Sequence, residues 1–150
     1  MRWRTLTTLT LLCGASWKVL LQFHQPAKLE KIQLLSHEFK IPSRVEIWVL
    51  PATTLPEQDG WQHLGFVRLG NNERTSFEAR ELKTVYVEAE VEPVQKVKLV
   101  LHECHFNKLN GAMQVALVSI SVFGVTDGSP QQFQSAGEQS MPNLPPRFAL

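Results

Sequence analysis

Four consecutive residues of the sequence, His102, Glu103, Cys104 and His105, have side chains that could bind a metal. A closed zinc site needs four such ligands, and the H-E-x-x-H motif relies on a helix to bring its two histidines together. On a strand, His102 and Cys104 would face away from Glu103 and His105. We therefore expect the end of a strand that leads into a polar loop, with no metal and no cofactor.

Cys104 and a group of carboxylates are the remaining candidates for catalysis. A thiol beside a histidine can act as a nucleophile, but no orienting acid or oxyanion loop is recognisable. We expect a half-buried structural cysteine. Glu88, Glu90 and Glu92 share one face if they lie on a strand, and we interpret them as a solvated edge, because catalytic carboxylates need a cleft to separate their pKa values. The chain also lacks a G-x-S-x-G motif and a glycine-rich phosphate loop, so the sequence predicts no catalytic residue and no enzyme.

The composition is that of a globular chain with almost no net charge. Of 150 residues, 43% are hydrophobic and 19% charged, and the net charge is +1. This length suffices for one domain with a core, and the charge gives no bulk attraction to nucleic acid or to an anionic membrane. No apolar run is long enough to cross a bilayer. The two cysteines, Cys13 and Cys104, form no disulfide framework, which favours a reducing compartment.

Residues 1–16 allow two interpretations. Two arginines, a short Leu/Thr stretch and small residues up to Ala15 follow the outline of a secretory signal peptide. The alternative is an irregular N-terminus that happens to be apolar.

From Trp17 onward, apolar residues recur at every second position, which is typical of strands with one buried face. The inward-facing positions predicted in this way are Trp17, Val19, Leu21, Phe23, Val45, Ile47, Val49, Val85, Val87, Val97, Leu99 and Leu101. Residues 114–123 are apolar or small on both faces, so we expect a central, covered strand there.

Residues rich in Pro, Gly and Asn separate the strands and predict turns, including one over the stretch HQPAK, 24–28. About seven strands with such breaks predict an all-β sandwich of jelly-roll or immunoglobulin-like type. We expect Trp61 to plug one end of the core, and Trp48 either to face a partner or to be covered by the other sheet or the tail. Residues 127–150 are rich in Gln, Ser and Pro and predict a disordered tail after a domain at 17–126.

Three stretches carry a family resemblance: QLLSHEFKIPSRVEIWV, LGFVRLGNNERTSFEARELKTVYV and HFNKLNGAMQVALVSISVFG. They resemble the N-terminal jelly-roll domain of the TOG-domain centrosomal and ciliary-tip protein family, over about residues 17–126. The resemblance implies an all-β, discoidin-like (galactose-binding-like) jelly-roll β-sandwich. It also implies a cytoplasmic, cytoskeletal location at the centrosome, centriole or cilium, and protein partners of the microtubule apparatus there.

The chain departs from the full members of that family. It has no room for their coiled coil, TOG domain or zinc fingers, and it resembles a form that is truncated before Trp17. The stretch FKIP, 39–42, has Phe39 where the family's microtubule-end motif has Ser, so we do not interpret it as that motif.

The polar stretch NNERTSFEAREL is the most specific part of the resemblance, because nothing in a strand pattern requires it. In a jelly roll it would meet HEFKIPSR and HECHFNKLNG at one end. We predict a protein-binding surface on these loops, formed by Asn71, Asn72, Glu73, Arg74, Arg80, His105, Asn107, Lys108 and Asn110. The alternative is that the Glu and Arg side chains pair with each other and only hold the loops together.

Two functions remain open at this point. The first is a non-enzymatic protein-interaction domain that supports cilium assembly or ciliary-tip organisation. The second is a secreted discoidin-like module that binds a carbohydrate or a lipid, for which loops usually present apolar side chains. The polar loops of this chain favour the first.

Overall fold

The structure is a computed structural model that describes residues 8–12 and 16–126, which form seven strands and one 3-10 helix. All pairings between these strands are antiparallel. The elements are β1 (Thr8–Leu12), β2 (Trp17–Ser36), β3 (Arg44–Pro51), β4 (Gln62–Arg68), η1 (Glu73–Thr75), β5 (Leu82–Tyr86), β6 (Val94–Leu101) and β7 (Leu117–Val125).

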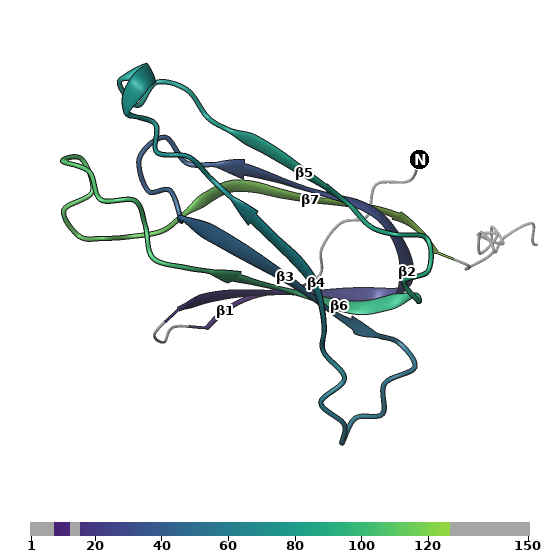
Figure 1. Cartoon of the computed structure of the whole chain (residues 1–150). Helices are drawn as coiled ribbons and strands as arrows, with labels where there is room; N and C mark the ends of the chain where they lie inside the picture. Colours follow the sequence, from purple (N-terminus) through teal and green to yellow (C-terminus); the bar gives the residue numbers. More distant parts are fainter. Residues whose placement is uncertain (1–7, 13–15, 127–150) are drawn as a thin grey trace, which may run out of the picture.

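Strand β2 is shared by the two layers of a sandwich. Its first part pairs with β1 and β6, in a sheet of order β1-β2-β6-β3-β4. Its second part lies between β5 and β7. Figure 1 shows β2 bending from one layer into the other. This arrangement confirms the prediction of an all-β, discoidin-like jelly-roll sandwich.

The turn predicted over residues 24–28 is wrong, because β2 continues through this stretch. The register of β2 against β6 shifts between Gln22 and Ala27, at the point where β2 leaves one sheet for the other. Pro26 lies within this irregular stretch, where proline is tolerated because no regular ladder bond from its nitrogen is required.

The alternation of apolar residues is confirmed where it was clearest. Val45, Ile47 and Val49 of β3 are fully buried, as are Val97 and Leu99 of β6. Together with residues of β2 they form the core between the sheets. Burial of these side chains is the main force that stabilises the fold.

Two other strand predictions are wrong. β7 is not a central, covered strand: among the described strands it pairs with β2 alone, and Val118 is exposed. Its apolar outer positions lie on an edge strand. The carboxylates at 88–92 do not share a strand face either, because β5 ends at Tyr86 and the chain then turns.

Trp61 does not plug the core. It is half-buried, and the Lys98 ammonium lies 4.2 Å from the centre of its ring and 5.2 Å from that of Trp48. Trp48 also contacts the ring of His63 at 4.6 Å. The indole rings therefore lie on the outer side of the five-stranded sheet, where cation–π contacts with Lys98 fix them.

Part of the predicted leader is regular. Thr8–Leu12 forms β1 and pairs antiparallel with β2, from Thr8 opposite Gln22 to Leu12 opposite Lys18. The remaining leader residues up to Ala15, with Cys13 and the predicted cleavage position, lie outside the described residues, as does the predicted disordered tail at 127–150. None of the described helices has the length and apolar character needed to span a bilayer.

Candidate functional site

Three loops meet at one end of the sandwich: 37–43 between β2 and β3, 69–81 between β4 and β5, and 102–116 between β6 and β7 (Figure 1). The Asn72 side chain donates to the Glu38 carbonyl oxygen at 3.2 Å. The Asn107 side chain donates to the Phe39 carbonyl oxygen at 2.8 Å. His105 Nε2 donates to the carbonyl oxygen of Leu69 at 2.6 Å. Each loop is thereby joined to the other two, as the sequence predicted.

Arg80 joins two of these loops through an ion pair. Its Nε lies 2.7 Å from Glu38 Oε1, and its Nη2 contacts the same oxygen. A hydrogen bond from the backbone, with the Arg80 guanidinium, holds the pKa of Glu38 below its ordinary value. Arg80 thus follows the alternative interpretation from the sequence, in which Glu and Arg hold the loops together.

Two asparagines of the predicted binding surface are buried rather than presented to a partner. Asn107 is 5% exposed and Asn110 is 3% exposed. Asn107 Oδ1 accepts from the Leu109 amide, and Asn110 exchanges two hydrogen bonds with the backbone of Gln114. Buried amides that are fully bonded fix the path of a loop. Both residues therefore fix the backbone of the surface; Asn107 also lines the floor of the groove described below, whereas Asn110 does not.

The short helix η1 and the residues after it lie across from the loop that carries Asn107 and Asn110. The Asn72 carbonyl oxygen accepts from the amides of Thr75 and Phe77. Ser76 and Phe77 follow with left-handed φ angles of 52° and 63°. Non-glycine residues rarely adopt this conformation, and it persists where surrounding bonds impose it. The backbone is thereby turned so that Phe77 lines a groove.

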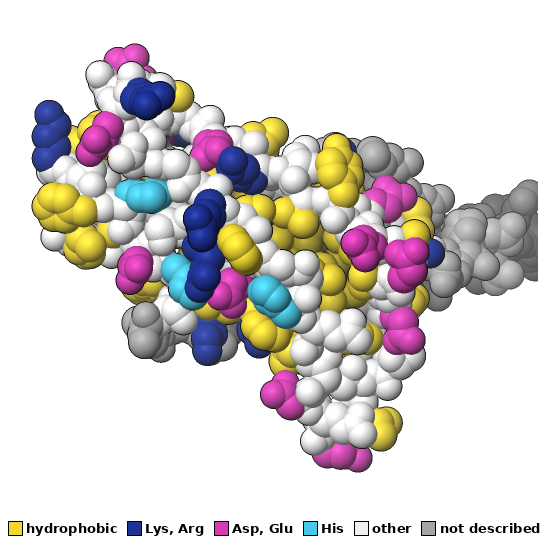
Figure 2. Space-filling view, in the orientation of Figure 1, with side chains coloured by type: hydrophobic (Ala, Val, Ile, Leu, Met, Phe, Trp, Pro, Cys, Tyr) yellow, Lys and Arg dark blue, Asp and Glu magenta, His cyan; other side chains and the backbone are white. Residues whose placement is uncertain are grey.

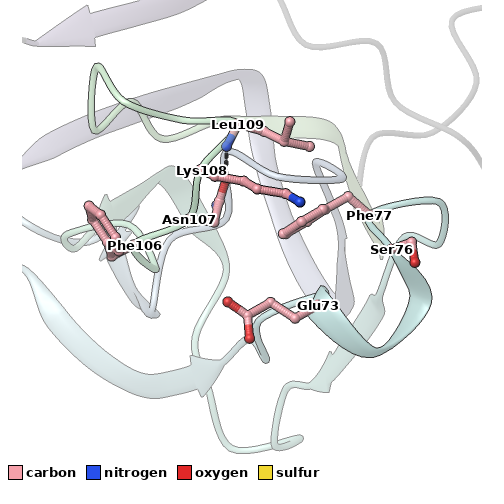
Figure 3. A pocket seen from close by; sticks show the side chains of 7 residues that line it. All are labelled: Glu73, Ser76, Phe77, Phe106, Asn107, Lys108 and Leu109. Carbon is pink, nitrogen blue, oxygen red and sulfur yellow. Dashed lines mark hydrogen bonds between the residues drawn. The ribbon is translucent and has the colours of Figure 1, made fainter.

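This groove lies between η1 and the β6–β7 loop and has a volume of about 580 Å³. Figure 3 shows the Glu73 and Lys108 side chains between Phe106 on one side and Phe77 on the other. Phe106 is 78% exposed and Leu109 is 50% exposed. Ser76, Phe77, Phe106 and Leu109 were not predicted from the sequence, and the expectation that these loops present only polar side chains is wrong. The signal that could have revealed the last two is an apolar side chain at two positions of an otherwise polar turn, HFNKLNG.

Of the other predicted residues, Glu73 and Lys108 line this groove, and Arg74 lies next to Glu73 on η1. Asn71, Glu73, Arg74 and Lys108 are exposed. Within the described part of the chain, the charged groups of Glu73, Arg74 and Lys108 have no ion-pair partner. Figure 2 shows charged side chains of both signs around apolar ones at this end of the molecule, at the upper left. An apolar centre with a charged rim is the usual anatomy of a protein-binding surface.

The side chains of the His-Glu-Cys-His stretch, 102–105, contact different partners and do not converge on one point. His102 Nε2 donates to Glu46 Oε1 at 2.9 Å, and His105 bonds to Leu69. Cys104 is buried, with Sγ 3.8 Å from Met113 Sδ. Among residues 8–12 and 16–126, no three His, Cys, Asp or Glu side chains come together in a way that could hold a metal ion.

Comparison with known proteins identifies relatives in sequence and in structure. The family described as "Centrosomal protein CEP104, N-terminal domain" matches residues 4–124. The chain is 40% identical over 116 residues to the centrosomal protein of 104 kDa from Mus musculus and to that from Homo sapiens. This match covers 75% of the chain but 12% of each relative, so the chain spans about an eighth of their length.

Two solved structures share the fold. A chain in the crystal structure of reduced XRCC1 bound to the DNA polymerase beta catalytic domain matches with a TM-score of 0.51 and 12% identity, covering 74% of each chain. The SusE-like protein BT2857 matches with a TM-score of 0.52 and 17% identity, over 71% of this chain and 46% of that one.

Proposed function

Because the chain belongs to the family of the centrosomal protein CEP104 N-terminal domain, we propose that it is a non-enzymatic protein-interaction domain of the centriolar and ciliary microtubule apparatus. In this proposal it supports cilium assembly or ciliary-tip organisation by binding a protein partner. The family membership supports the location, and the end of the sandwich supports the mode of action.

The observation that carries the proposal is the groove between η1 and the β6–β7 loop. Phe106 and Leu109 present apolar surface beside the charged groups of Glu73 and Lys108. The buried amides of Asn107 and Asn110 hold the backbone beneath them. A preformed site loses little conformational entropy when a partner binds, so its exposed aromatic side chain can contribute most of its contact energy.

Arg74 and Lys108 contribute positive charge to this surface, and both can be replaced without disturbing the core. Their side chains are exposed, and Lys108 lines the groove itself. Complementary charges at the rim of an interface raise the association rate and select the partner. We therefore expect a partner whose surface combines an apolar side chain with acidic groups.

The proposal can be tested by the location of the chain in ciliated cells. We expect the chain with a C-terminal tag to accumulate at centrioles or ciliary tips with its N-terminal residues retained. Recovery of the tagged chain from the medium, starting near Ser16, would contradict the proposal. That result would instead favour a secreted module with a carbohydrate or lipid ligand.

A further inference from the structure

Strand β4 leaves one edge of the five-stranded sheet open. Among the described strands it pairs with β3 alone. The His102 amide donates to the Arg44 carbonyl oxygen, so the backbone groups of Arg44 face β6 and not Arg68, its partner on β4. Hydrogen-bonded and non-bonded pairs alternate along antiparallel strands. The backbone groups of Arg68 and Phe66 therefore point away from β3, toward the open edge.

The side chains of the same two residues form a surface beside that edge. Phe66 is 50% exposed. The guanidinium carbons of Arg44 and Arg68 lie 5.5 Å and 5.8 Å from the centre of its ring. An exposed aromatic ring beside two arginines resembles the centre of a protein interface, where aromatic residues and arginine are enriched.

The two arginines differ in how far their charge is already neutralised. Arg44 Nη2 lies 3.0 Å from Glu46 Oε1. The Arg68 guanidinium has no carboxylate within ion-pair distance in the described part of the chain. Both arginines line a hollow of about 460 Å³, together with Ser43, Leu69, His102, Glu103 and His105. Because Glu46 already neutralises Arg44, Arg68 is the cation in this hollow that a partner's carboxylate can pair with.

We propose that the open edge of β4 is a second docking site, which binds an extended acidic segment of a protein partner as an added strand. The segment pairs its backbone with that of Phe66 and Arg68. It places a carboxylate against the Arg68 guanidinium and an apolar side chain on the Phe66 ring. Strand addition of this kind takes affinity from backbone bonds and specificity from alternate side chains.

A bulge limits the length of the pairing. Gly65 lies opposite Ile47 and His63 opposite Trp48, so Leu64 is an extra residue in β4. Gly65 adopts a φ of 140°, a conformation that other residues rarely adopt. Bulges on edge strands prevent long, unspecific pairing. A partner therefore gains only a few backbone bonds here, and its contacts with Phe66 and Arg68 decide whether it binds.

The test is a selection of ten-residue random peptides displayed on phage against the complete chain, followed by fluorescence anisotropy with the synthetic peptide selected. We expect the peptides to carry an apolar residue and an Asp or Glu two positions apart, because Phe66 and Arg68 lie on the same face of β4. Arg68→Glu should weaken binding of that peptide by about tenfold or more, and Phe66→Ala similarly. Lys28→Glu, at an exposed cation on β2 rather than on β4, is the control and should leave binding unchanged.

A backbone measurement separates strand addition from side-chain contact alone. Amide hydrogen exchange of Phe66 and Arg68 should slow when the peptide is bound, because their amides gain partners. The proposal is overturned if no peptide is enriched, if the enriched peptides lack acidic residues, or if Arg68→Glu binds them as well as the natural chain does. Unchanged exchange at Phe66 and Arg68 in the bound state would also overturn it.

Discussion

Asn107 and Phe39 join two loops that are far apart in the sequence: the Asn107 side chain donates to the Phe39 carbonyl oxygen at 2.8 Å. Asn107 is almost completely buried and also accepts from the Leu109 amide. The exposed Phe106 and Lys108 on either side are therefore held in place by a residue whose side chain is almost entirely bonded inward.

Replacing this asparagine should destabilise the fold. Asn107→Ala leaves the Phe39 carbonyl oxygen and the Leu109 amide without their bonds, and should lower the free energy of unfolding by about 1–3 kcal/mol. Chemical denaturation measures the change. Lys108→Ala is the neighbouring control and should shift the free energy by less than about 0.5 kcal/mol, because that side chain is exposed. Equal effects of the two variants would contradict the assigned roles.

Gly124 allows close approach of β7 to β2. A Cβ atom at this position would lie 2.4 Å from the Lys28 carbonyl oxygen and 3.1 Å from the Leu29 Cα. These are backbone atoms that cannot rotate away, so Gly124→Ala should destabilise the chain by about 1–3 kcal/mol. Gly111→Ala meets nothing within 4 Å and is the control. Thermal unfolding of both variants checks the prediction, and a stable Gly124→Ala variant would refute it.

Stability should fall in acid through Glu46. Burial raises the pKa of Glu46, but hydrogen bonds from Trp48 and His102, with the charges of His102 and Arg44, outweigh it and hold the pKa below the ordinary 4.5. A carboxyl whose pKa is lowered by folding stabilises the folded state above its unfolded pKa. That contribution is lost as the pH falls through the lower, folded value.

The contribution is measured by urea unfolding of the natural chain and of Glu46→Gln at a series of pH values, as the difference between their free energies of unfolding. The variant should be less stable than the natural chain at pH 7, and the difference should shrink below pH 4.5. Glu103→Gln, at an exposed residue of the same region, should show a smaller difference at pH 7. A difference for Glu46→Gln that stays constant into strong acid would show that the carboxylate charge is not the cause.

The strand pattern could be predicted where one face is buried and the other wet. The alternation in β3 and β6 identified Val45, Ile47, Val97 and Leu99 as core residues, because a strand turns successive side chains to opposite faces. The point at which β2 passes from one sheet to the other is not marked by any alternation of apolar and polar residues. Pro26 indicated a turn, yet tertiary pairing of β2 on both sides of it keeps the strand continuous.

The site could be predicted only in outline. The polar composition of the three loops indicated that they form one end, but it did not distinguish residues that bond inward from those that face out. Asn107, Asn110 and the exposed Asn71 are all asparagines in polar loops, so the sequence does not tell them apart. Only the folded backbone decides which of their side chains is buried. The left-handed turn that places Phe77 in the groove depends on bonds to Asn72 and has no residue-type signal of its own.

Phe106 should be the main apolar contact for the partner at the groove. Because its side chain is 78% exposed, Phe106→Ala should leave the unfolding temperature unchanged. It should weaken partner binding by about tenfold, as truncation of an aromatic anchor commonly does. Centrosome-associated proteins recovered with the tagged natural chain and with the variant provide the comparison. The exposed Tyr86→Ala is the control, since Tyr86 lies on β5 and does not line the groove.

The most direct test of the central claim is the recruitment of Arg74→Glu/Lys108→Glu in ciliated cells. Both residues are exposed, so the double variant should fold as the natural chain does, which its thermal unfolding verifies. We predict that it loses most of the centriolar or ciliary-tip signal that the natural chain shows at equal expression. Undiminished recruitment of a folded double variant would show that the charged rim of the groove does not bind the partner.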